Sequence, residues 1–184
     1  TLDKESEDNA SKLTKGLPAG PGGAKGRVVF TADDAEEWKN KGEQVILIRE
    51  ETSPEDVHGM HAAEAILTAR GGMTSHAALV ARGWGKCCIV GCNEINISVN
   101  DKQLSVGDII IKDGDWITMN GTTGVVYLGQ IDLIPADPDR NEEYKELMTW
   151  ADEIRKLRIR TNAESPEDAK QAIFNVENFD SYVL

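Results

Sequence analysis

The sequence predicts a mixed α/β domain, because short apolar segments alternate with helix start signals between residues 27 and 90. Val45–Arg49 is a nearly continuous apolar run, which is typical of a strand that is covered on both faces. Thr31 and Ser53 precede helix-like segments in the position of N-caps. Between Gln103 and Leu128 the apolar period falls to two and Gly-containing turns interrupt the pattern, which indicates a β-meander of tight hairpins.

Each element of the α/β region has its own local signal. A Gly/Pro-rich approach from Leu17 to Gly26 leads into the first strand, and Thr31 with Asp34 three residues later predicts a capping box for the first helix. Gly42 stands where that helix would stop, and Pro54 occupies the first position of the next helix. In chain order we predict strands at 27–30, 45–49, 65–68 and 87–90, and helices at 32–41, 54–63 and 76–83.

Pro135 and Pro138 mark a break after this region. The next helix, predicted at 142–156, has apolar residues at spacings of three and four, so one of its faces requires a partner. A strand-like segment at 158–162 and a second Ser-Pro-Glu-Asp sequence at Ser165 follow. We therefore divide the chain into a flexible N-terminal arm or linker at 1–15, a main domain at 16–130, a linker with its helix at 131–157, and the start of a further domain at 158–184.

The composition argues against several classes of function. The 184 residues include 20 Lys and Arg against 32 Asp and Glu, and a net charge of −12 disfavours binding to nucleic acids or anionic membranes. No apolar run approaches the roughly 18 to 20 residues that span a bilayer. The polar, acidic start resembles neither a signal peptide nor a transit peptide, and the missing initiator Met indicates a fragment or a processed chain.

The cysteines and two of the three histidines are predicted to have structural roles. Cys87, Cys88 and Cys92 form an odd, closely spaced set, which favours a reducing compartment and buried side chains over disulfides. A zinc site would need a second cluster of ligands, which the sequence lacks. His58 and His61 lie three residues apart on a predicted helix with no further ligand to complete a metal site, so we expect them to contact solvent and neighbouring side chains.

The clearest chemical signature lies at residues 68–83, where a strand ends, two glycines turn the backbone and a helix begins. His76 would lie in the first turn of this helix, where unpaired N–H groups and the positive end of the helix dipole attract a phosphate. The same field favours the neutral imidazole, whose nitrogen can take a phosphoryl group and pass it on. Gly71 and Gly72 would let the backbone approach the phosphate closely. The alternative is a capped helix with an incidental histidine.

Three further side chains flank the predicted phosphate position. Arg70, at the end of the strand, either meets the phosphate or remains at the surface. Arg82, two turns along the helix, is predicted to be a surface or docking residue. Trp84 is predicted to anchor the packing near the end of the helix.

Residues 71–78 read Gly-Gly-Met-Thr-Ser-His-Ala-Ala, and residues 80–88 read Val-Ala-Arg-Gly-Trp-Gly-Lys-Cys-Cys. This combination resembles the phosphohistidine domain of the PEP-utilising enzymes, and among these the family of pyruvate, phosphate dikinases is most similar, over roughly residues 16–170. After about Ala172 the resemblance ends. Supporting segments are Gly16–Ala19, Glu51–Val57, Gly59–Ala63, Asn120–Gly124, and Asn162–Ala163 with Ser165–Ala169, the last pair resembling the entry into a C-terminal barrel.

The resemblance implies a mobile, swivelling domain of β/β/α type, followed by a linker helix and the truncated start of a barrel domain that binds phosphoenolpyruvate and pyruvate. His76 would be phosphorylated at its Nε2 (tele) nitrogen. ATP would pyrophosphorylate it at an ATP-grasp domain, orthophosphate would remove the outer phosphoryl group, and pyruvate would take the remaining one to give phosphoenolpyruvate. Mg²⁺ and ATP are thereby implied for the full-length enzyme, whereas this domain alone is expected to bind no cofactor and no metal.

The resemblance also assigns roles around His76. Thr74 matches a threonine that a regulatory protein phosphorylates in the plant enzymes, which makes a regulatory kinase and phosphatase possible partners. Ser75 is expected to contribute a hydroxyl contact, and Gly71, Gly72 and Arg70 to support the phosphate. The other implied partners are the ATP-grasp and barrel domains of the same enzyme, in a homo-oligomer located in the cytoplasm or the plastid stroma.

Two alternatives remain open at this stage. Within the same superfamily, the carrier domain of phosphoenolpyruvate synthase or of enzyme I of the phosphotransferase system would share the histidine motif. Met73, Thr74 and Ser75 with the Trp-Gly-Lys-Cys-Cys run argue against both. In a different class, a truncated chain would be a non-catalytic target of the regulatory kinase, because it lacks the ATP-grasp domain and a complete barrel.

Overall fold

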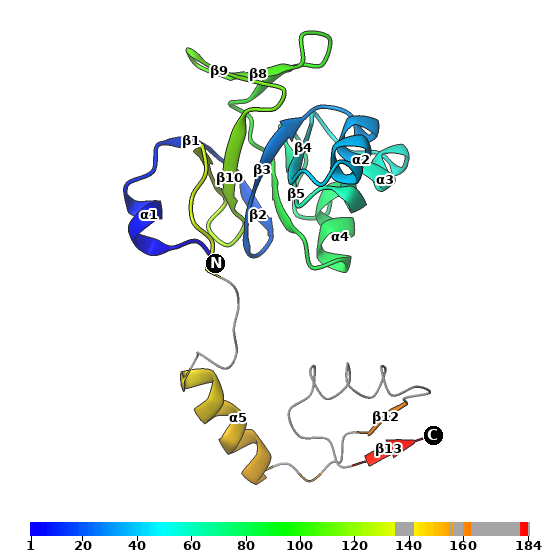
Figure 1. Cartoon of the computed structure of the whole chain (residues 1–184), viewed down its shortest axis with the longest axis vertical. Helices are drawn as coiled ribbons and strands as arrows, with labels where there is room; N and C mark the ends of the chain where they lie inside the picture. Colours follow the sequence, from blue (N-terminus) through cyan, green and yellow to red (C-terminus); the bar gives the residue numbers. More distant parts are fainter. Residues whose placement is uncertain (135–141, 155, 157–159, 163–180, 184) are drawn as a thin grey trace. The chain divides into compact units, whose positions relative to one another are not determined.

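The computed structural model describes residues 1–134, 142–154, 156, 160–162 and 181–183, which belong to two units, Thr1–Pro135 and Ala136–Leu184 (Figure 1). The strands of the first unit are β1 (Lys12–Lys15), β2 (Leu17–Gly20), β3 (Gly23–Val29), β4 (Val45–Arg49), β5 (Ala65–Thr68), β6 (Cys87–Val90), β7 (Asn96–Ser98), β8 (Gln103–Val106), β9 (Ile109–Lys112), β10 (Trp116–Asn120) and β11 (Val125–Leu128). Its helices are α1 (Lys4–Asp8), α2 (Ala32–Asn40), the 3₁₀ turn η1 (Pro54–Asp56), α3 (Val57–Ala62) and α4 (His76–Gly83).

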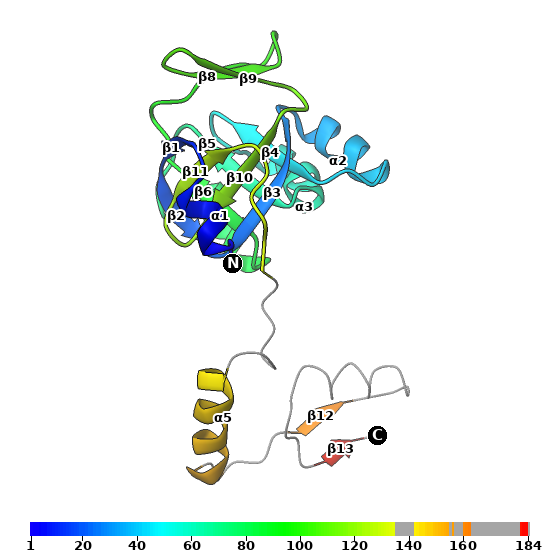
Figure 2. The same ribbon diagram turned by 60° about the vertical axis from the view of Figure 1, so that its left-hand side comes forward.

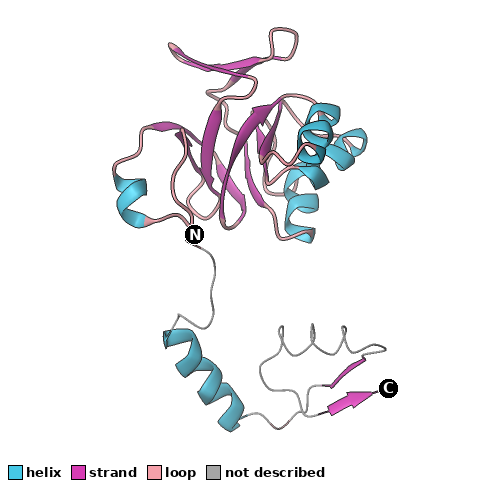
Figure 3. Ribbon diagram, in the orientation of Figure 1, coloured by secondary structure: helices cyan, strands magenta, loops and turns pink. Residues whose placement is uncertain are grey.

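Eight of these strands form one mixed sheet in the order β1-β11-β10-β3-β4-β5-β6-β2 (Figure 3). Its centre, β3 to β6, is parallel, and parallel neighbours require a helix or another long connection between successive strands. The remaining strands join antiparallel at the two sides. The α/β prediction for residues 27–90 is confirmed, and the predicted limits of β4, β5, β6 and α4 coincide with the observed ones.

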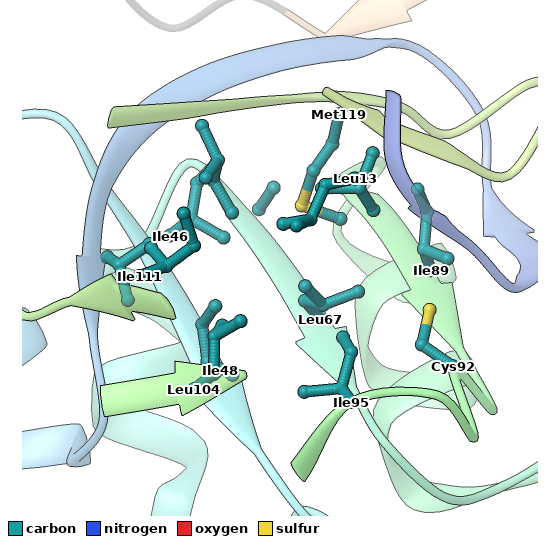
Figure 4. Packing of buried hydrophobic residues seen from close by; sticks show 14 of the residues in the cluster. Leu13, Ile46, Ile48, Leu67, Ile89, Cys92, Ile95, Leu104, Ile111 and Met119 are labelled. Atoms are coloured by element: carbon teal, nitrogen blue, oxygen red, sulfur yellow. The ribbon is translucent and has the colours of Figure 1, made fainter. Parts of the chain in front are cut away.

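The sheet is covered on both faces, as the continuous apolar run in β4 predicts. Val45 and Leu47 pack with α2, α3 and α4 on one face. Ile46 and Ile48 point to the other face and share a cluster with Leu104 and Ile111, which come from the small sheet β7-β8-β9 (Figure 4). The first unit therefore has three layers: a small sheet, a large sheet and a layer of helices, which Figure 2 shows from a second direction.

The large sheet curves back on itself, because its two edge strands are consecutive in the chain. Only Gly16 separates β1 from β2, although a flat eight-stranded sheet would hold its edges about 30 Å apart. Gly16, which lies in the chain between the two edge strands, donates its N–H to the carbonyl of Gly124 at 2.8 Å. A Cβ at this position would lie 2.4 Å from Cys92 Sγ and 2.7 Å from the carbonyl oxygen of Val90, so only glycine fits the crossing.

The prediction of a flexible arm at residues 1–15 is wrong. Asp3 caps α1 by accepting the N–H of Ser6 at 2.9 Å, and β1 pairs with β11 in the main sheet. Residues 1–3 also run antiparallel to 132–134: Asp3 N donates to Asp132 O and Ile134 N donates to Thr1 O, each at 2.8 Å. The sequence reads as an arm because its acidic, polar composition hides the few apolar residues that are buried, Leu2 and Leu13.

Two other predictions need correction. The segment 103–128 is not one meander: β8 and β9 form a hairpin in the small sheet, whereas β10 and β11 form a hairpin in the large one. The Gly/Pro-rich approach contains the edge strand β2, where Pro18 is tolerated because an edge strand leaves one side of its backbone unpaired. The short strand β7 was not predicted, although Ile95, Ile97 and Val99 alternate with polar residues there.

Glu7 holds the N-terminal segment against the sheet, and its removal should destabilise the first unit. Its Oε1 accepts hydrogen bonds from Asn120 Nδ2 and Tyr127 Oη, both at 2.7 Å. Burial, and then the bond to Glu7, raises the pKa of Tyr127 to about 12, so its hydroxyl remains a donor at neutral pH. Glu7→Ala leaves two donors unpaired, which costs roughly 1–3 kcal/mol and lowers the thermal midpoint by about 3–10 °C.

The matched control is Glu5→Ala, which removes an exposed carboxylate from the same helix. Calorimetry of the full 184-residue chain should give it a midpoint within about 1–2 °C of the unchanged protein. Equal midpoints for the two variants would show that residues 1–15 do not contribute to the stability of the first unit.

The second unit contains α5 (Glu142–Ile154) and the parallel pair β12 (Arg160–Asn162) and β13 (Ser181–Val183). Its helix lies within the predicted range of 142–156, and Tyr144, Leu147 and Ile154 are exposed on it. The rest of the predicted barrel start, including Ser165, lies outside the described residues. No helix among the described residues is both long and apolar enough to cross a membrane.

Candidate functional site

The loop between β5 and α4 turns the backbone sharply and delivers a capped helix end. Thr68, the last residue of β5, donates its hydroxyl to the carbonyl of Arg70 at 2.6 Å. Ser75 N donates to Gly72 O at 2.9 Å, and Ser75 Oγ accepts the N–H of Ala78 at 3.4 Å as the N-cap of α4. The predicted helix start at His76 is thus confirmed, with Ser75 as the cap.

His76 is the first residue of α4, and its side chain is partly exposed. Its Nδ1 lies 3.0 Å from Oγ1 of Thr52, which stands in the loop between β4 and η1. β4 and β5 are neighbouring parallel strands, so the loops that follow them emerge at the same edge of the sheet. This topology brings together two residues that are 24 positions apart in the chain.

The contact with Thr52 distinguishes the two ring nitrogens of His76. Nδ1 is engaged with a hydroxyl, which can either donate or accept, whereas Nε2 has no such contact within the described part of the chain. A neutral imidazole carries one proton, and the tautomer with the proton on Nδ1 donates it to Thr52 and keeps a lone pair on Nε2. In that tautomer the site presents an imidazole nucleophile at the N-terminus of a helix.

Thr52 is the site residue that the residue-by-residue reasoning missed. In the sequence, Thr52 is singled out only as part of the segment Glu51–Val57, which supports the family resemblance. The signal that could have found it is positional: a hydroxyl residue three places after the end of one central strand should face the loop that follows the next strand.

The two glycines before the helix have different roles in the backbone. Gly71 has φ = +106°, a conformation that L side chains rarely adopt, and a Cβ there would lie 3.1 Å from the Cβ of Ser75. Gly72 has no positive φ, and a Cβ there would meet nothing within 4 Å. The turn therefore requires glycine at position 71. At position 72 the backbone does not require glycine, and the missing side chain leaves open space beside the start of α4.

Both arginines of this region are exposed. The side chain of Arg70 is 72% exposed and its Nε lies 3.4 Å from Glu50 Oε2, so it is paired with a carboxylate. Arg82 lies at the surface, as predicted, and it also ties the loop to β2: its Nη2 donates to Met73 O at 2.6 Å and its Nη1 to Ala19 O at 3.4 Å.

Thr74 and Met73 are exposed on this loop, directly before the cap. Thr74 is accessible to a modifying enzyme, and it lies two residues from His76. Trp84, expected as a packing anchor, is 41% exposed, and its ring meets the ring of His61 edge-on at 5.3 Å between centroids. It therefore packs on a surface histidine and not in the core.

The remaining histidines and the cysteines have structural surroundings. His58 Nε2 lies 2.9 Å from Asp33 Oδ1, on the neighbouring helix. All three cysteines are free and buried, as predicted, and burial raises the pKa of Cys87 to about 11 and those of Cys88 and Cys92 to about 12. Their thiols remain protonated at neutral pH and are poor nucleophiles. Within the residues that the structure describes, no three His, Cys, Asp or Glu side chains gather as metal ligands.

The residues that form this arrangement match a known protein family. Residues 41–124, which run from before β4 to the turn between β10 and β11 and include Thr52 and His76, match the family of the PEP-utilising enzyme, mobile domain. The region that carries His76 belongs to this family.

The curated relatives of this family member are plant enzymes. The chain is 60% identical over 157 residues to pyruvate, phosphate dikinase 1, chloroplastic, of Arabidopsis thaliana, covering 85% of this chain and 16% of that protein. It is 56% identical over 160 residues to the chloroplastic pyruvate, phosphate dikinase of Mesembryanthemum crystallinum, covering 87% and 17%. The chain thus spans about a sixth of the length of these relatives. An NMR structure of Enzyme I is 24% identical, with a TM-score of 0.34, over 60% of this chain and 38% of that one.

Proposed function

We propose that this chain is the swivelling phosphohistidine domain of a pyruvate, phosphate dikinase, with His76 as the carrier and Nε2 as the atom that bears the phosphoryl group. The observation that carries the proposal is the position of His76: it opens a capped helix while its Nδ1 contacts Thr52 at 3.0 Å. The high identity to two plant dikinases supports the choice of enzyme.

The geometry suits a transfer in two steps. In the first, the lone pair on Nε2 attacks phosphorus, the bond from phosphorus to the leaving oxygen breaks, and that oxygen keeps the electron pair. The ring becomes cationic, and its Nδ1–H continues to donate to Thr52 Oγ1. In the second, an acceptor oxygen attacks phosphorus, the N–P bond breaks, and the electron pair returns to Nε2. One nitrogen therefore serves both half-reactions, whereas the methyl proton that pyruvate must lose to form the attacking enolate would go to a base of the barrel domain.

The surroundings of His76 supply the other predicted contacts. The first N–H groups of α4 and the open space at Gly72 give an anion room beside the helix start. Ser75 keeps the helix end ordered through its cap, and Gly71 provides the turn. Arg70 would contribute to phosphate binding only by leaving Glu50.

The substrates and partners follow from the same proposal. An ATP-grasp domain would pyrophosphorylate His76 from ATP, orthophosphate would take the outer group as diphosphate, and a barrel domain would pass the rest to pyruvate. Mg²⁺ and ATP would bind in the full-length enzyme, outside this domain. We place the protein in the plastid stroma or the cytoplasm, as part of a homo-oligomer, and propose Thr74 as the target of a regulatory kinase and phosphatase.

The experiment that tests this function supplies the partner domains in trans. The 184-residue chain is incubated with labelled phosphoenolpyruvate and an intact plant pyruvate, phosphate dikinase whose own carrier histidine has been replaced, so that any phosphohistidine must lie on this chain. Mass spectrometry after digestion at alkaline pH should find the label on His76. Label on His58 or His61 would overturn the assignment. A parallel incubation with an equally altered enzyme I should label the chain far more slowly.

A further inference from the structure

A buried carboxylate that the transfer chemistry does not use lies one loop away from His76. The side chain of Asp56, the last residue of η1, is only 7% exposed. Its Oδ2 accepts the N–H of Ser53 at 2.9 Å and the hydroxyl of Ser53 at 3.3 Å. Its Oδ1 lies 3.2 Å from Arg49 Nε in an ion pair, although this N–H is not aimed well enough to count as a hydrogen bond.

These contacts fix both ends of the segment that contains Thr52. Arg49 is the last residue of β4, and its Nη1 also donates to the carbonyl of Phe30 at 3.2 Å, so its guanidinium is tied to the body of the sheet. Ser53 follows Thr52 directly in the chain. Asp56 therefore clamps the loop at residue 53 to the end of β4, and leaves little freedom to Thr52, which contacts Nδ1 of His76. A buried carboxylate is costly without such partners, which argues against an incidental position.

We propose that Asp56 is a positioning residue, which acts through Ser53 and Thr52 to hold the proton of His76 on Nδ1 and so to leave Nε2 free. The proposal rests on the proposed function for the role of Nε2 in phosphoryl transfer. The position of the proton on the ring can be measured without any phosphoryl transfer. In free neutral histidine the proton prefers Nε2, which would block the nitrogen that is exposed here. The Thr52 hydroxyl, fixed at 3.0 Å from Nδ1, reverses that preference when it accepts the Nδ1 proton, and this is the direction that the proposal requires.

The chain offers variants that separate the clamp from the hydroxyl. Asp56→Asn keeps the shape of the side chain but replaces one carboxylate oxygen by a donor, so it cannot face Arg49 and Ser53 N–H together. Thr52→Val removes the hydroxyl and leaves the clamp, and Thr52→Ser keeps both. Asp33→Asn is the matched control, because it alters a carboxylate that contacts His58 at 2.9 Å on another part of the fold.

The measurement is long-range ¹H–¹⁵N NMR of the full chain, labelled at histidine and held at about pH 8. The unchanged protein and Thr52→Ser should show a protonated Nδ1 and an unprotonated Nε2 at His76. Asp56→Asn and Thr52→Val should move His76 toward the Nε2-protonated form, whereas Asp33→Asn should change only His58. Loss of the Nδ1 proton should slow the labelling of His76 about tenfold, in step with the tautomer population.

The possible outcomes test the positioning role separately from the proposed function. An unchanged tautomer in Asp56→Asn, or a proton on Nε2 in the unchanged protein, would overturn the positioning role even if His76 proves to be the carrier. A tautomer shift without any phosphorylation of the unchanged chain would support the positioning role and overturn the proposed function. If Asp56→Asn does not fold, Ser53→Ala, which removes only the 3.3 Å contact, replaces it and should give a smaller shift in the same direction.

Discussion

Replacing His76 by Asn will abolish phosphoryl transfer to and from this chain, while its fold remains intact. An amide nitrogen has no available lone pair, so neither half-reaction can proceed through the residue. The labelled phosphoenolpyruvate assay and the reverse assay, with ATP as donor, should both fall to background. His76 is partly exposed at the first position of α4, so the thermal midpoint should change by no more than about 1–2 °C.

The matched controls are His58→Asn and His61→Asn, which remove the other two histidines of the chain. Each should retain transfer within about twofold of the unchanged protein, because His58 pairs with Asp33 and His61 packs on Trp84, and neither belongs to the loop between β5 and α4. Loss of only one half-reaction in His76→Asn would mean that a second group carries the phosphoryl in the other, which contradicts the single-carrier account.

A negative charge at Thr74 should inhibit the carrier without unfolding it. Thr74→Asp places a carboxylate two residues before His76 and beside the N–H groups that would hold an incoming anion. Two unit charges about 5 Å apart at an effective dielectric of 20 repel by roughly 3 kcal/mol, which corresponds to about a hundredfold in rate. Because Thr74 is exposed, screening reduces this effect, and we expect phosphorylation of His76 to slow by between about ten- and a hundredfold.

Thr74→Val and Thr74→Ser test whether charge is the cause. The helix should survive in all three variants, since an anion near a helix N-terminus is favourable, and the thermal midpoints should agree within about 2 °C. Raising the salt concentration to about 1 M, where the Debye length is about 3 Å, should recover part of the rate of the Asp variant only. An equal inhibition by Val would assign the effect to loss of the hydroxyl or to shape, and not to charge.

The sequence-based predictions succeeded where a local signal dominates. β4, β5 and β6 are apolar runs bounded by polar turns, and α4 begins at a serine cap after two glycines, so their limits follow from periodicity and capping alone. The burial of Cys87, Cys88 and Cys92 follows from their place in and after a central strand. In these segments the contacts made in the folded protein agree with what the local sequence pattern already predicts.

The predictions failed where distant parts of the chain decide. β1 is a strand because it pairs with β11, and residues 1–3 are ordered because 132–134 pair with them. In the same way, nothing near Thr52 indicates that its hydroxyl will meet a histidine 24 residues later, since that contact depends on the parallel pairing of β4 with β5. Arg82 is exposed as predicted, but its hydrogen bonds could not be foreseen for the same reason: the two acceptors, at Ala19 and Met73, are brought together only by the fold.

The pairing of residues 1–3 with 132–134 closes the first unit at both of its ends. Thr1 and Ile134, the first and last described residues of this unit, are joined there by the two 2.8 Å backbone bonds between these segments. Loss of either segment would leave backbone groups of the other without their partners, so the two ends should fray together and not one after the other.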